Sequence, residues 1–462
     1  MPAFAPAARV PHLERPDGSA PPGRHRLDRS LESAIPHHDI TPEKERAILV
    51  GAPTRDVSPT SAEEHLEELE RLLDTAGGVS AGVVRQRLDA PHPKYFIGEG
   101  KAHELKELAR EKGADLAIFD DELSPAQSKN LEELLKIRVM DRTELILDIF
   151  ATRARTSEAQ MQVELAQLEY MLPRLRRLWT HLERTAGGIG MRGPGETQLE
   201  TDRRLIGRRI RDLKEKLAVV ARRRATQRKA RSGEFRAALV GYTNAGKSSI
   251  LRGLSGAEVF VENRLFATVD PATRVVDLPG GGHVLVTDTV GFIRKLPHDL
   301  VASFRATLEE ATEADALLHV IDAAYPYWPE QKHVVEGVLG ELGFGDRPVM
   351  LVFNKVDRLT HAEERALREQ VHAVFPQPSI FVSAVEPGGL DGLRERLQEA
   401  MRALQPEVRL ELPSTDGEAL ATVYREGEVI SREEDGERIR LVARVPQRTL
   451  GRLQRREGVV IS

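Results

Sequence analysis

The residues with the clearest chemical signature form a glycine-rich turn that ends in a lysine and a serine. Gly241–Ser248 reads G-Y-T-N-A-G-K-S, and it follows the apolar run Phe235–Val240 and precedes a helical pattern. Such a turn lets backbone N–H groups surround phosphates, with the positive end of the next helix behind them. We expect Lys247 to reach the β- and γ-phosphates and the Ser248 hydroxyl to bind Mg²⁺. The turn therefore predicts a nucleoside triphosphate site of the P-loop type.

A second motif indicates which base this site binds. Asn354–Asp357 reads N-K-V-D and ends the apolar run Val349–Phe353. An Asp carboxylate at this place accepts hydrogen bonds from N1–H and N2–H₂ of guanine, whereas adenine would leave it unsatisfied. Ser383–Ala384 follows another apolar run and suits the loop that contacts guanine through its backbone. Together these motifs predict GTP rather than ATP.

Two segments between these motifs are predicted to respond to the γ-phosphate. Asp288–Gly291 resembles the D-x-x-G element, in which Asp288 would hold Mg²⁺ through water and the Gly291 N–H would meet the γ-phosphate. Thr268 is the best candidate for the mobile threonine that closes on Mg²⁺, and Thr273 is its rival. Segments of this kind become ordered when the γ-phosphate is bound and are released after hydrolysis.

Two further positions bear on the rate of hydrolysis. Phe292 follows Gly291, where Ras-like GTPases place a glutamine that orients the attacking water. Because a phenyl ring cannot hydrogen-bond a water, we expect slow intrinsic turnover and a partner that completes the site. Asn244 leads to the hypothesis that K⁺ supplies missing positive charge, although Asn is also a common turn residue.

The predicted site as a whole draws on five short segments. We expect Lys247, Thr268 and Gly291 to act in hydrolysis. We expect Ser248, Thr268 and Asp288 to hold Mg²⁺, the last through water. The predicted GTP-binding residues are Gly241, Tyr242, Thr243, Asn244, Ala245, Gly246, Lys247, Ser248, Ser249, Phe266, Ala267, Thr268, Asp288, Thr289, Val290, Gly291, Asn354, Lys355, Asp357, Ser383 and Ala384.

Length and composition limit the class of protein that carries this site. The chain has 462 residues, which favours two to four domains, and 40% of them are hydrophobic. The formal net charge is only −5, so any surface for nucleic acid must be a local patch. The absence of cysteine excludes disulfides and fits a reducing cytoplasm. No apolar run approaches the roughly 20 residues that span a bilayer.

The N-terminal part of the chain divides into two predicted segments. Residues 1–44 mix Pro, Arg, His and Ser without periodicity, which is typical of disorder. Residues 45–155 alternate helix and strand patterns and predict an α/β domain with a small, mostly parallel sheet. Within it, Val84–Leu88 and Tyr95–Ile97 are predicted as strands.

Three more segments complete a multidomain α/β architecture. Residues 156–232 carry two leucine-rich stripes at steps of three and four, which predict an antiparallel helical hairpin joined by a Gly-rich tip, 187–195. Residues 233–405 predict a central, doubly wound P-loop GTPase domain. Residues 406–462 predict a small α+β domain, in which Glu418–Tyr424 is expected to be a strand.

The second hairpin helix carries an excess of positive charge. Between 203 and 231 it has thirteen Arg and Lys residues and only two acidic ones, Asp212 and Glu215. A solvated helix face is the simpler interpretation, but so large an excess of one sign favours contact with a phosphate backbone. The residues predicted to contact RNA are Arg192, Arg203, Arg204, Arg222, Arg223 and Arg224.

With these residues in view, the chain resembles the HflX family of translational GTPases over most of 46–405. The resemblance is carried by motifs outside the nucleotide site, including Tyr95–Gly98, Glu122–Pro125, Gln162–Leu168, Arg192–Thr197 and Leu199–Arg204. It implies binding to the 50S subunit and the 70S ribosome and splitting or rescue of stalled ribosomes under stress. It also implies a cytoplasmic protein, and we expect a monomer when it is free.

Two alternatives remain open from the residues alone. The chain could be a GTP-gated ribosome-assembly factor, in which hydrolysis only times release. It could also be an RNA-remodelling enzyme that uses ATP in its N-terminal domain, although Gly98–Lys101 is too short to indicate a phosphate loop.

Overall fold

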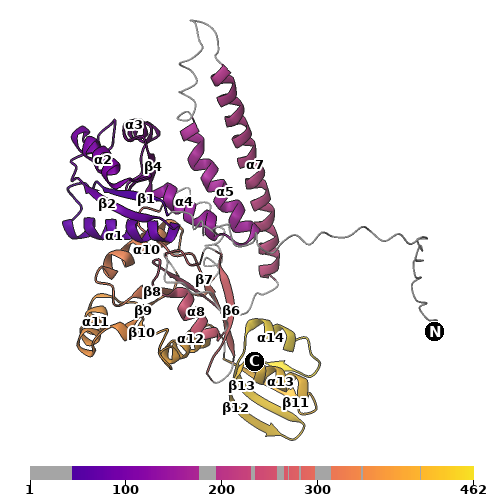
Figure 1. The fold of residues 1–462 in the computed structure, drawn as a ribbon. Helices are drawn as coiled ribbons and strands as arrows, with labels where there is room; N and C mark the ends of the chain where they lie inside the picture. Colours follow the sequence, from indigo (N-terminus) through magenta and orange to yellow (C-terminus); the bar gives the residue numbers. More distant parts are fainter. Residues whose placement is uncertain are drawn as a thin grey trace, which may run out of the picture. The chain divides into compact units, whose positions relative to one another are not determined.

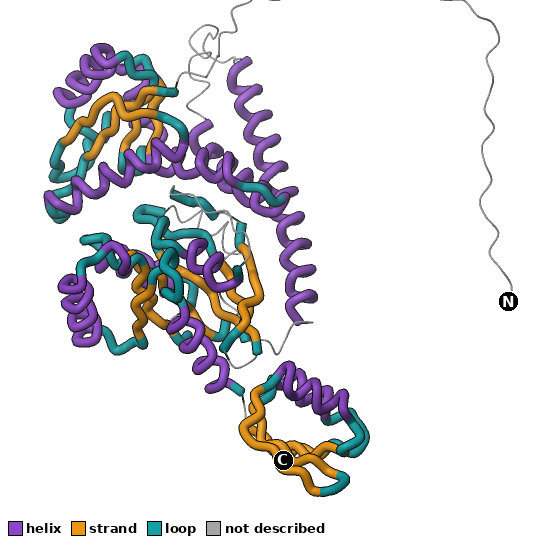
Figure 2. The backbone as a smooth tube through the Cα atoms, turned by 60° about the horizontal axis from the view of Figure 1, so that its bottom comes forward, coloured by secondary structure: helices purple, strands orange, loops and turns teal. Residues whose placement is uncertain are grey.

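A computed structural model describes residues 44–175, 194–229, 235–256, 265–268, 270–279, 282–296, 314–344, 347–405 and 407–462. The side chains of 194–199, 224–229 and 447–448 are not described. Apart from Lys44, the stretch that we predicted to be disordered lies outside the described residues. Three sheets organise the described chain, as Figures 1 and 2 show.

The first sheet is parallel, with strand order β2-β1-β3-β4. Its strands are β1 (Arg46–Gly51), β2 (Val79–Arg85), β3 (Leu116–Phe119) and β4 (Arg138–Asp141). Alternate residues of a strand face opposite sides, so Ile48 and Val50 join one core while Ala47 and Leu49 join another. The helices α2 (Glu99–Lys112) and α3 (Pro125–Leu135) cover the first side, and α1 (Pro59–Ala76) and α4 (Arg142–Arg153) cover the second. The predicted parallel α/β arrangement is confirmed.

One strand prediction in this region had wrong bounds, and a second was wrong. The strand predicted at Val84–Leu88 is β2, which begins at Val79 and ends at Arg85. Tyr95–Ile97 forms no strand, because Phe96 is left-handed at φ 67° and closes a tight turn onto His92 through two backbone hydrogen bonds of 2.7 and 2.9 Å. The apolar run there reflects burial of the side chains rather than extension of the backbone.

Two long helices form the helical hairpin. α5 (Ser157–Met171) ends at the 3₁₀ turn Leu172–Arg174, whose Pro173 cannot continue an α-helical hydrogen-bond pattern. α7 (Pro194–Lys229) packs on α5 through Leu165, Ile210 and Leu213. α7 starts inside the predicted Gly-rich tip, whose residues 187–193 lie outside the described residues. None of the described helices has the length and apolar character needed to cross a membrane.

The second sheet has the order β10-β9-β8-β5-β7-β6, with only β6 antiparallel. Its strands are β5 (Arg236–Gly241), β6 (Ala272–Asp277), β7 (His283–Asp288), β8 (Ala316–Asp322), β9 (Val349–Asn354) and β10 (Ser379–Val382). The helices α8 (Lys247–Ser255) and α12 (Asp391–Leu404) pack on one face, and α10 (Trp328–Glu341) and α11 (His361–Val374) pack on the other. This is the predicted doubly wound sheet, and its central strand β5 leads into the glycine-rich turn.

The third sheet is antiparallel, with the order β12-β13-β11-β14. It comprises β11 (Glu407–Pro413), β12 (Glu428–Asp435), β13 (Arg438–Arg444) and β14 (Val460–Ile461), with α13 (Gly417–Glu426) and α14 (Gln447–Leu453). The strand predicted at Glu418–Tyr424 is in fact α13. Asp416 caps this helix by accepting from the Ala419 N–H at 3.0 Å, and Ala419 and Val423 share its buried face at helical spacing.

Candidate functional site

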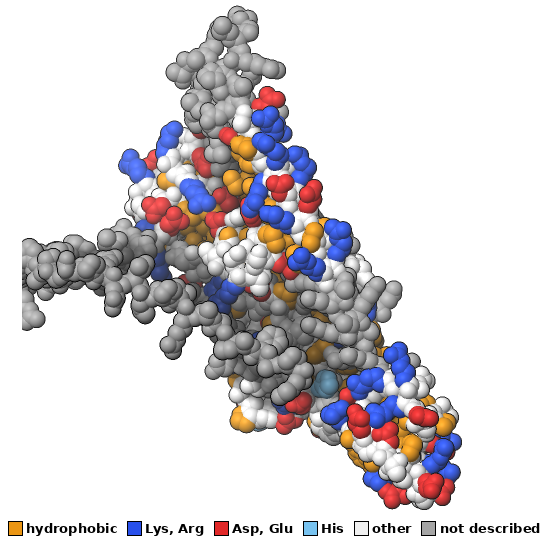
Figure 3. All heavy atoms as spheres, turned by 90° about the vertical axis from the view of Figure 1, so that its right-hand side faces the viewer, with side chains coloured by type: hydrophobic (Ala, Val, Ile, Leu, Met, Phe, Trp, Pro, Cys, Tyr) orange, Lys and Arg blue, Asp and Glu red, His pale blue; other side chains and the backbone are white. Residues whose placement is uncertain are grey.

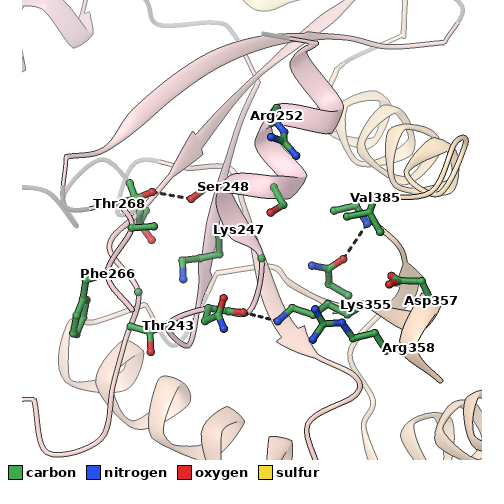
Figure 4. A pocket seen from close by; sticks show the side chains of 18 residues that line it. Thr243, Lys247, Ser248, Arg252, Phe266, Thr268, Lys355, Asp357, Arg358 and Val385 are labelled. Carbon is green, nitrogen blue, oxygen red and sulfur yellow. Dashed lines mark hydrogen bonds between the residues drawn. The ribbon is translucent and has the colours of Figure 1, made fainter. Parts of the chain in front are cut away.

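A cavity of about 350 Å³ opens at the carboxyl end of β5, where the glycine-rich turn meets the start of α8. Crevices at the carboxyl ends of strands are where open α/β sheets bind ligands. Figure 4 shows Phe266 and Thr268 at one end of the cavity, Asp357, Arg358 and Val385 at the other, and Lys247 between them.

The glycine-rich turn is shaped by residues that need little space or a left-handed backbone. Asn244 has φ 61° and Gly246 has φ 98°. A Cβ at Gly246 would collide with the side-chain amide of Asn354, so only glycine fits there. The Lys247 ammonium donates to the carbonyls of Gly241 and Tyr242 at 3.0 and 2.8 Å. Burial lowers the pKa of Lys247 to about 8, and its amine lies inside the glycine-rich turn.

Three oxygen-bearing side chains converge at the first turn of α8. The Ser248 hydroxyl donates to the Asp288 carboxylate at 2.6 Å, and the Thr268 hydroxyl lies 2.9 Å from the same carboxylate and 2.7 Å from Ser248 Oγ. The second carboxylate oxygen of Asp288 is buried without a partner among the described residues. Burial raises the pKa of Asp288 despite the nearby Lys247. Hydroxyl and carboxylate oxygens are the donors that Mg²⁺ prefers, so this set fits that ion.

The opposite end of the cavity joins the N-K-V-D motif to the turn. The Asn354 side-chain amide donates to the Ala245 carbonyl at 3.0 Å, and the Lys355 ammonium donates to the Asn244 carbonyl at 2.7 Å. The Asn354 side-chain oxygen accepts from the Ala384 N–H at 3.2 Å. Motifs more than a hundred residues apart are thus held together by hydrogen bonds.

Asp357 is held by the companion loop. The Ser383 hydroxyl donates to Asp357 Oδ1 at 2.6 Å and accepts from the backbone N–H groups of Val385 and Glu386. Asp322 pairs with Lys355 at 2.6 Å and fixes the direction of that side chain. This end of the cavity therefore presents an oriented carboxylate beside backbone N–H groups.

The predicted site residues divide into those that line the cavity and those that support it. Thr268 lines the cavity, whereas its rival Thr273 lies in β6 and pairs with Thr287 at 2.9 Å. The predicted residues that line the cavity are Thr243, Asn244, Gly246, Lys247, Ser248, Ser249, Phe266, Ala267, Thr268, Thr289, Gly291, Asn354, Lys355, Asp357 and Ala384. Those that lie behind or beside it are Gly241, Tyr242, Ala245, Asp288, Val290 and Ser383.

Sequence reasoning missed several residues of this site. Arg252, Arg358 and Val385 line the cavity, and Asp322 orients Lys355. Arg252 lies in α8 one turn after Ser248, and Arg358 follows the N-K-V-D motif directly. Their proximity to the motifs was a usable signal, whereas Asp322 could be found only from the pairing of β8 with β9.

Phe292 does not face the cavity. Its side chain is 2% exposed and belongs to the core shared by α1, α4 and the sheet strand β5. Its backbone is paired with the turn, since the Phe292 N–H donates to the Gly241 carbonyl at 3.0 Å and the Thr243 N–H donates to the Phe292 carbonyl at 2.8 Å. No water-orienting side chain therefore comes from this position.

Behind the turn, the N-terminal α/β region contacts it through a buried charged cluster. The Tyr242 hydroxyl donates to Glu68 of α1 at 2.5 Å and accepts from the Arg294 N–H at 2.9 Å. Glu68 also pairs with Arg142 and Arg294. Burial alone would raise the pKa of Glu68, but Arg142 and Arg294 outweigh it and hold that pKa below its ordinary value.

The basic residues of α7 divide into two groups. Arg209 pairs with Glu164 of α5 at 2.6 Å, and Lys214 pairs with Glu169 at 2.8 Å, so these cations hold the hairpin together. The predicted RNA contacts Arg203, Arg204, Arg222 and Arg223 are exposed on α7. Figure 3 shows Lys and Arg side chains gathered along this side of the molecule. Arg192 and the Arg224 side chain lie outside the described residues.

Three family descriptions match consecutive parts of the chain. Residues 63–151 match the N-terminal region of GTP-binding GTPases, and 153–231 match their middle region. Residues 236–355 match a family described as 50S ribosome-binding GTPase. The last match includes the turn, Asp288–Gly291 and the first two residues of the N-K-V-D motif.

Curated relatives match most of the chain. GTPase HflX of Flavobacterium psychrophilum is 44% identical over 380 residues, which cover 78% of this chain and 91% of that protein. GTPase HflX of Escherichia coli K12 is 45% identical over 403 residues, which cover 86% of this chain and 93% of that protein. A solved GTP-binding protein from Sulfolobus solfataricus in complex with GDP matches at 24% identity and a TM-score of 0.42, over 77% of this chain and 98% of that one. With relatives of this identity over most of its length, the chain is a GTPase and belongs to the HflX family.

Proposed function

We propose that this GTPase associates with the 50S subunit and the 70S ribosome and splits or rescues stalled ribosomes under stress, with ribosome-stimulated hydrolysis. Family membership supports the proposal, as does the match of 236–355 to a family described as 50S ribosome-binding GTPase. The observation that carries it is the combination, in one chain, of a GTP cavity and a hairpin with exposed Arg203, Arg204, Arg222 and Arg223. The cytoplasm is the proposed location, because ribosomes are the proposed partner.

The proposed roles of the site residues follow from the geometry. Lys247 would neutralise the β- and γ-phosphates, and the N–H of Gly291 would meet the γ-phosphate. Gly291 already lies against the turn, since a Cβ there would be 2.8 Å from the Thr243 Cα and 3.0 Å from the Lys247 Nζ. Asp357, oriented by Ser383, would accept from guanine, while Ala384 offers its backbone beside the base.

Mg²⁺ is the proposed metal, held by Ser248, Thr268 and, through water, Asp288. The ion would neutralise charge on the β- and γ-phosphates as the bond to the γ-phosphorus breaks. Because Phe292 is buried away from the cavity, the side chain at this position does not orient the attacking water. K⁺ near Asn244 is the second proposed ion, and equal hydrolysis rates in potassium and sodium buffers would exclude it.

The exposed cations of α7 are the proposed contact with ribosomal RNA. Phosphate contacts by Arg and Lys release counterions, so affinity should fall steeply as salt rises. We propose the division predicted above for the whole chain: an N-terminal extension (1–44), an α/β domain (45–155), the hairpin (156–232), the GTPase domain (233–405) and the α+β domain (406–462). We also propose a monomeric free state.

The deciding experiment measures hydrolysis of GTP and ATP side by side, with and without purified 70S ribosomes, and follows 70S dissociation by light scattering. Stimulated GTP hydrolysis with dissociation of 70S particles supports the proposal. Stimulation without any change in subunit association would favour the assembly-factor alternative. ATP hydrolysis that persists in the Asp357→Asn variant would favour an ATP-dependent RNA-remodelling activity. The double variant Arg203→Gln/Arg204→Gln tests the RNA contact. It should bind 70S ribosomes more weakly than the wild type, and its affinity should depend less on the salt concentration.

A further inference from the structure

The two residues that flank Thr268 at positions 266 and 270 are anchored to elements outside the GTPase sheet. Phe266 is left-handed at φ 55° and only 2% exposed. Its ring meets the edge of Phe150, at the end of α4, with centroids 4.5 Å apart and planes at 66°. Phe150 is itself fully buried, and edge-to-face aromatic pairs of this kind favour one relative orientation. The backbone before Thr268 is therefore tied to α4.

Asp270 provides the second anchor. Its carboxylate accepts from the backbone N–H groups of Arg155 and Thr156 at 3.0 and 3.2 Å, and from the Thr156 hydroxyl. Thr156 is also the N-cap of α5 and accepts from the Ala159 N–H at 3.2 Å. A carboxylate at this place also meets the positive end of the helix. The backbone after Thr268 is therefore tied to the first residue of the hairpin.

Between these anchors, Thr268 lies at the proposed Mg²⁺ site. Its hydroxyl is 2.7 Å from Ser248 Oγ and 2.9 Å from the Asp288 carboxylate. A residue that lies between two anchored positions loses less conformational entropy when it closes on a ligand. The anchors therefore hold Thr268 where hydrolysis requires it.

We propose that Thr156 and Phe150 are positioning residues for GTP hydrolysis, which act on Thr268 through Asp270 and Phe266. The inference rests on the proposed role of Thr268. It assigns a part of the hydrolytic apparatus to Thr156, which precedes α5, and to Phe150 in α4. Both residues lie outside the glycine-rich turn, the D-x-x-G element and the N-K-V-D motif. Because Thr156 caps α5 and α5 packs along α7, a ligand that moved the hairpin would move Asp270 with it.

The test measures steady-state GTP hydrolysis and nucleotide affinity in the full chain. Thr156→Val removes the hydroxyl and Asp270→Ala removes the carboxylate. Thr156→Val should lower kcat about tenfold, the effect of losing one charge-assisted hydrogen bond. Asp270→Ala loses three such bonds and should lower kcat at least as much, while KM for GTP changes less than about threefold in each variant. Affinity for GDP should not change, since Thr268 is expected to meet only the γ-phosphate. The double variant should be no slower than Asp270→Ala alone, because the hydrogen bond that Thr156→Val removes is one of those that Asp270→Ala removes.

Matched variants separate positioning from helix capping. Thr156→Ser keeps the hydroxyl and should restore the wild-type kcat. Thr360→Val removes the corresponding cap of α11, where Thr360 accepts from the Glu363 N–H at 3.3 Å, and should leave kcat unchanged. Phe150→Leu gives an independent test of the other anchor and should also lower kcat.

The possible failures can be told apart. A wild-type kcat for Thr268→Ala would refute the proposed role of Thr268 itself. If Thr268→Ala is inactive but Thr156→Val and Asp270→Ala hydrolyse GTP like the wild type, the positioning proposal alone is overturned. Equal losses of GTP and GDP affinity in Thr156→Val would overturn it as well, because they would indicate a general disturbance of the cavity.

Discussion

The buried carboxylate of Glu68 joins the N-terminal α/β region to the nucleotide turn. It accepts from Arg142 and from the Tyr242 hydroxyl, and lies 3.5 Å from Arg294, with its side chain 1% exposed. Glu68→Gln keeps the size of the side chain but removes its charge. Arg142 and Arg294 would then stay buried with less opposing charge.

The expected loss follows from the cost of an uncompensated buried charge. Removing one partner of a buried ion pair costs about 3–5 kcal/mol. Asp120 still pairs with Arg142 at 2.7 Å and Glu64 with Arg294 at 3.3 Å, and glutamine retains an acceptor oxygen. We therefore expect the lower end of this range, about 3 kcal/mol in the free energy of unfolding.

Urea denaturation measures this loss. Fluorescence of buried Trp328 reports unfolding of the GTPase domain when Trp179→Phe removes the other tryptophan. Glu63→Gln is the matched control, because Glu63 lies on the same helix but pairs with Arg85 in solvent, and it should cost less than about 1 kcal/mol. If Glu68→Gln lowers the free energy of unfolding by no more than this control, the buried charged cluster does not stabilise the contact between the N-terminal α/β region and the nucleotide turn.

The remaining predictions concern chemistry, specificity, pH and the hairpin. Lys247→Ala should abolish GTP hydrolysis, and full activity in a phosphate-release assay would refute the site. Asp357→Asn should weaken GTP binding about 100-fold in competition titrations, since two hydrogen bonds to a charged acceptor are lost, and unchanged affinity would refute base reading by this carboxylate. The folded pKa of Glu68 lies below its unfolded value of about 4.3, so its contribution is present above that pH and lost as pH falls through the folded pKa. Between pH 5 and pH 3, roughly, the wild type should accordingly lose more unfolding free energy than the Glu68→Gln variant. Deleting 187–195 should spare intrinsic hydrolysis but impair stimulation by ribosomes, and unimpaired stimulation would exclude a role for the tip.

The sequence alone was enough to predict the motifs whose chemistry lies within a few adjacent residues. Gly241–Ser248 and Asn354–Asp357 each hold their chemistry within a few positions, so spacing predicts the turn and the base-reading motif directly. The same holds for Ser124 and Pro125, whose types predict the start of α3 and which form its N-cap and first position. Alternation of strand and helix patterns likewise predicted the first sheet and the doubly wound second sheet.

Only the tertiary structure decided which distant residues meet. Glu68 and Tyr242 are 174 positions apart, and Asp270 and Thr156 are 114 apart. A single carboxylate carries no periodic signal, so its partner depends on how whole helices and strands pack. The error at Tyr95–Ile97 has the same origin. Tyr95–Ile97 is apolar because the side chains are buried in a turn, and a short run of apolar residues does not distinguish burial from extension.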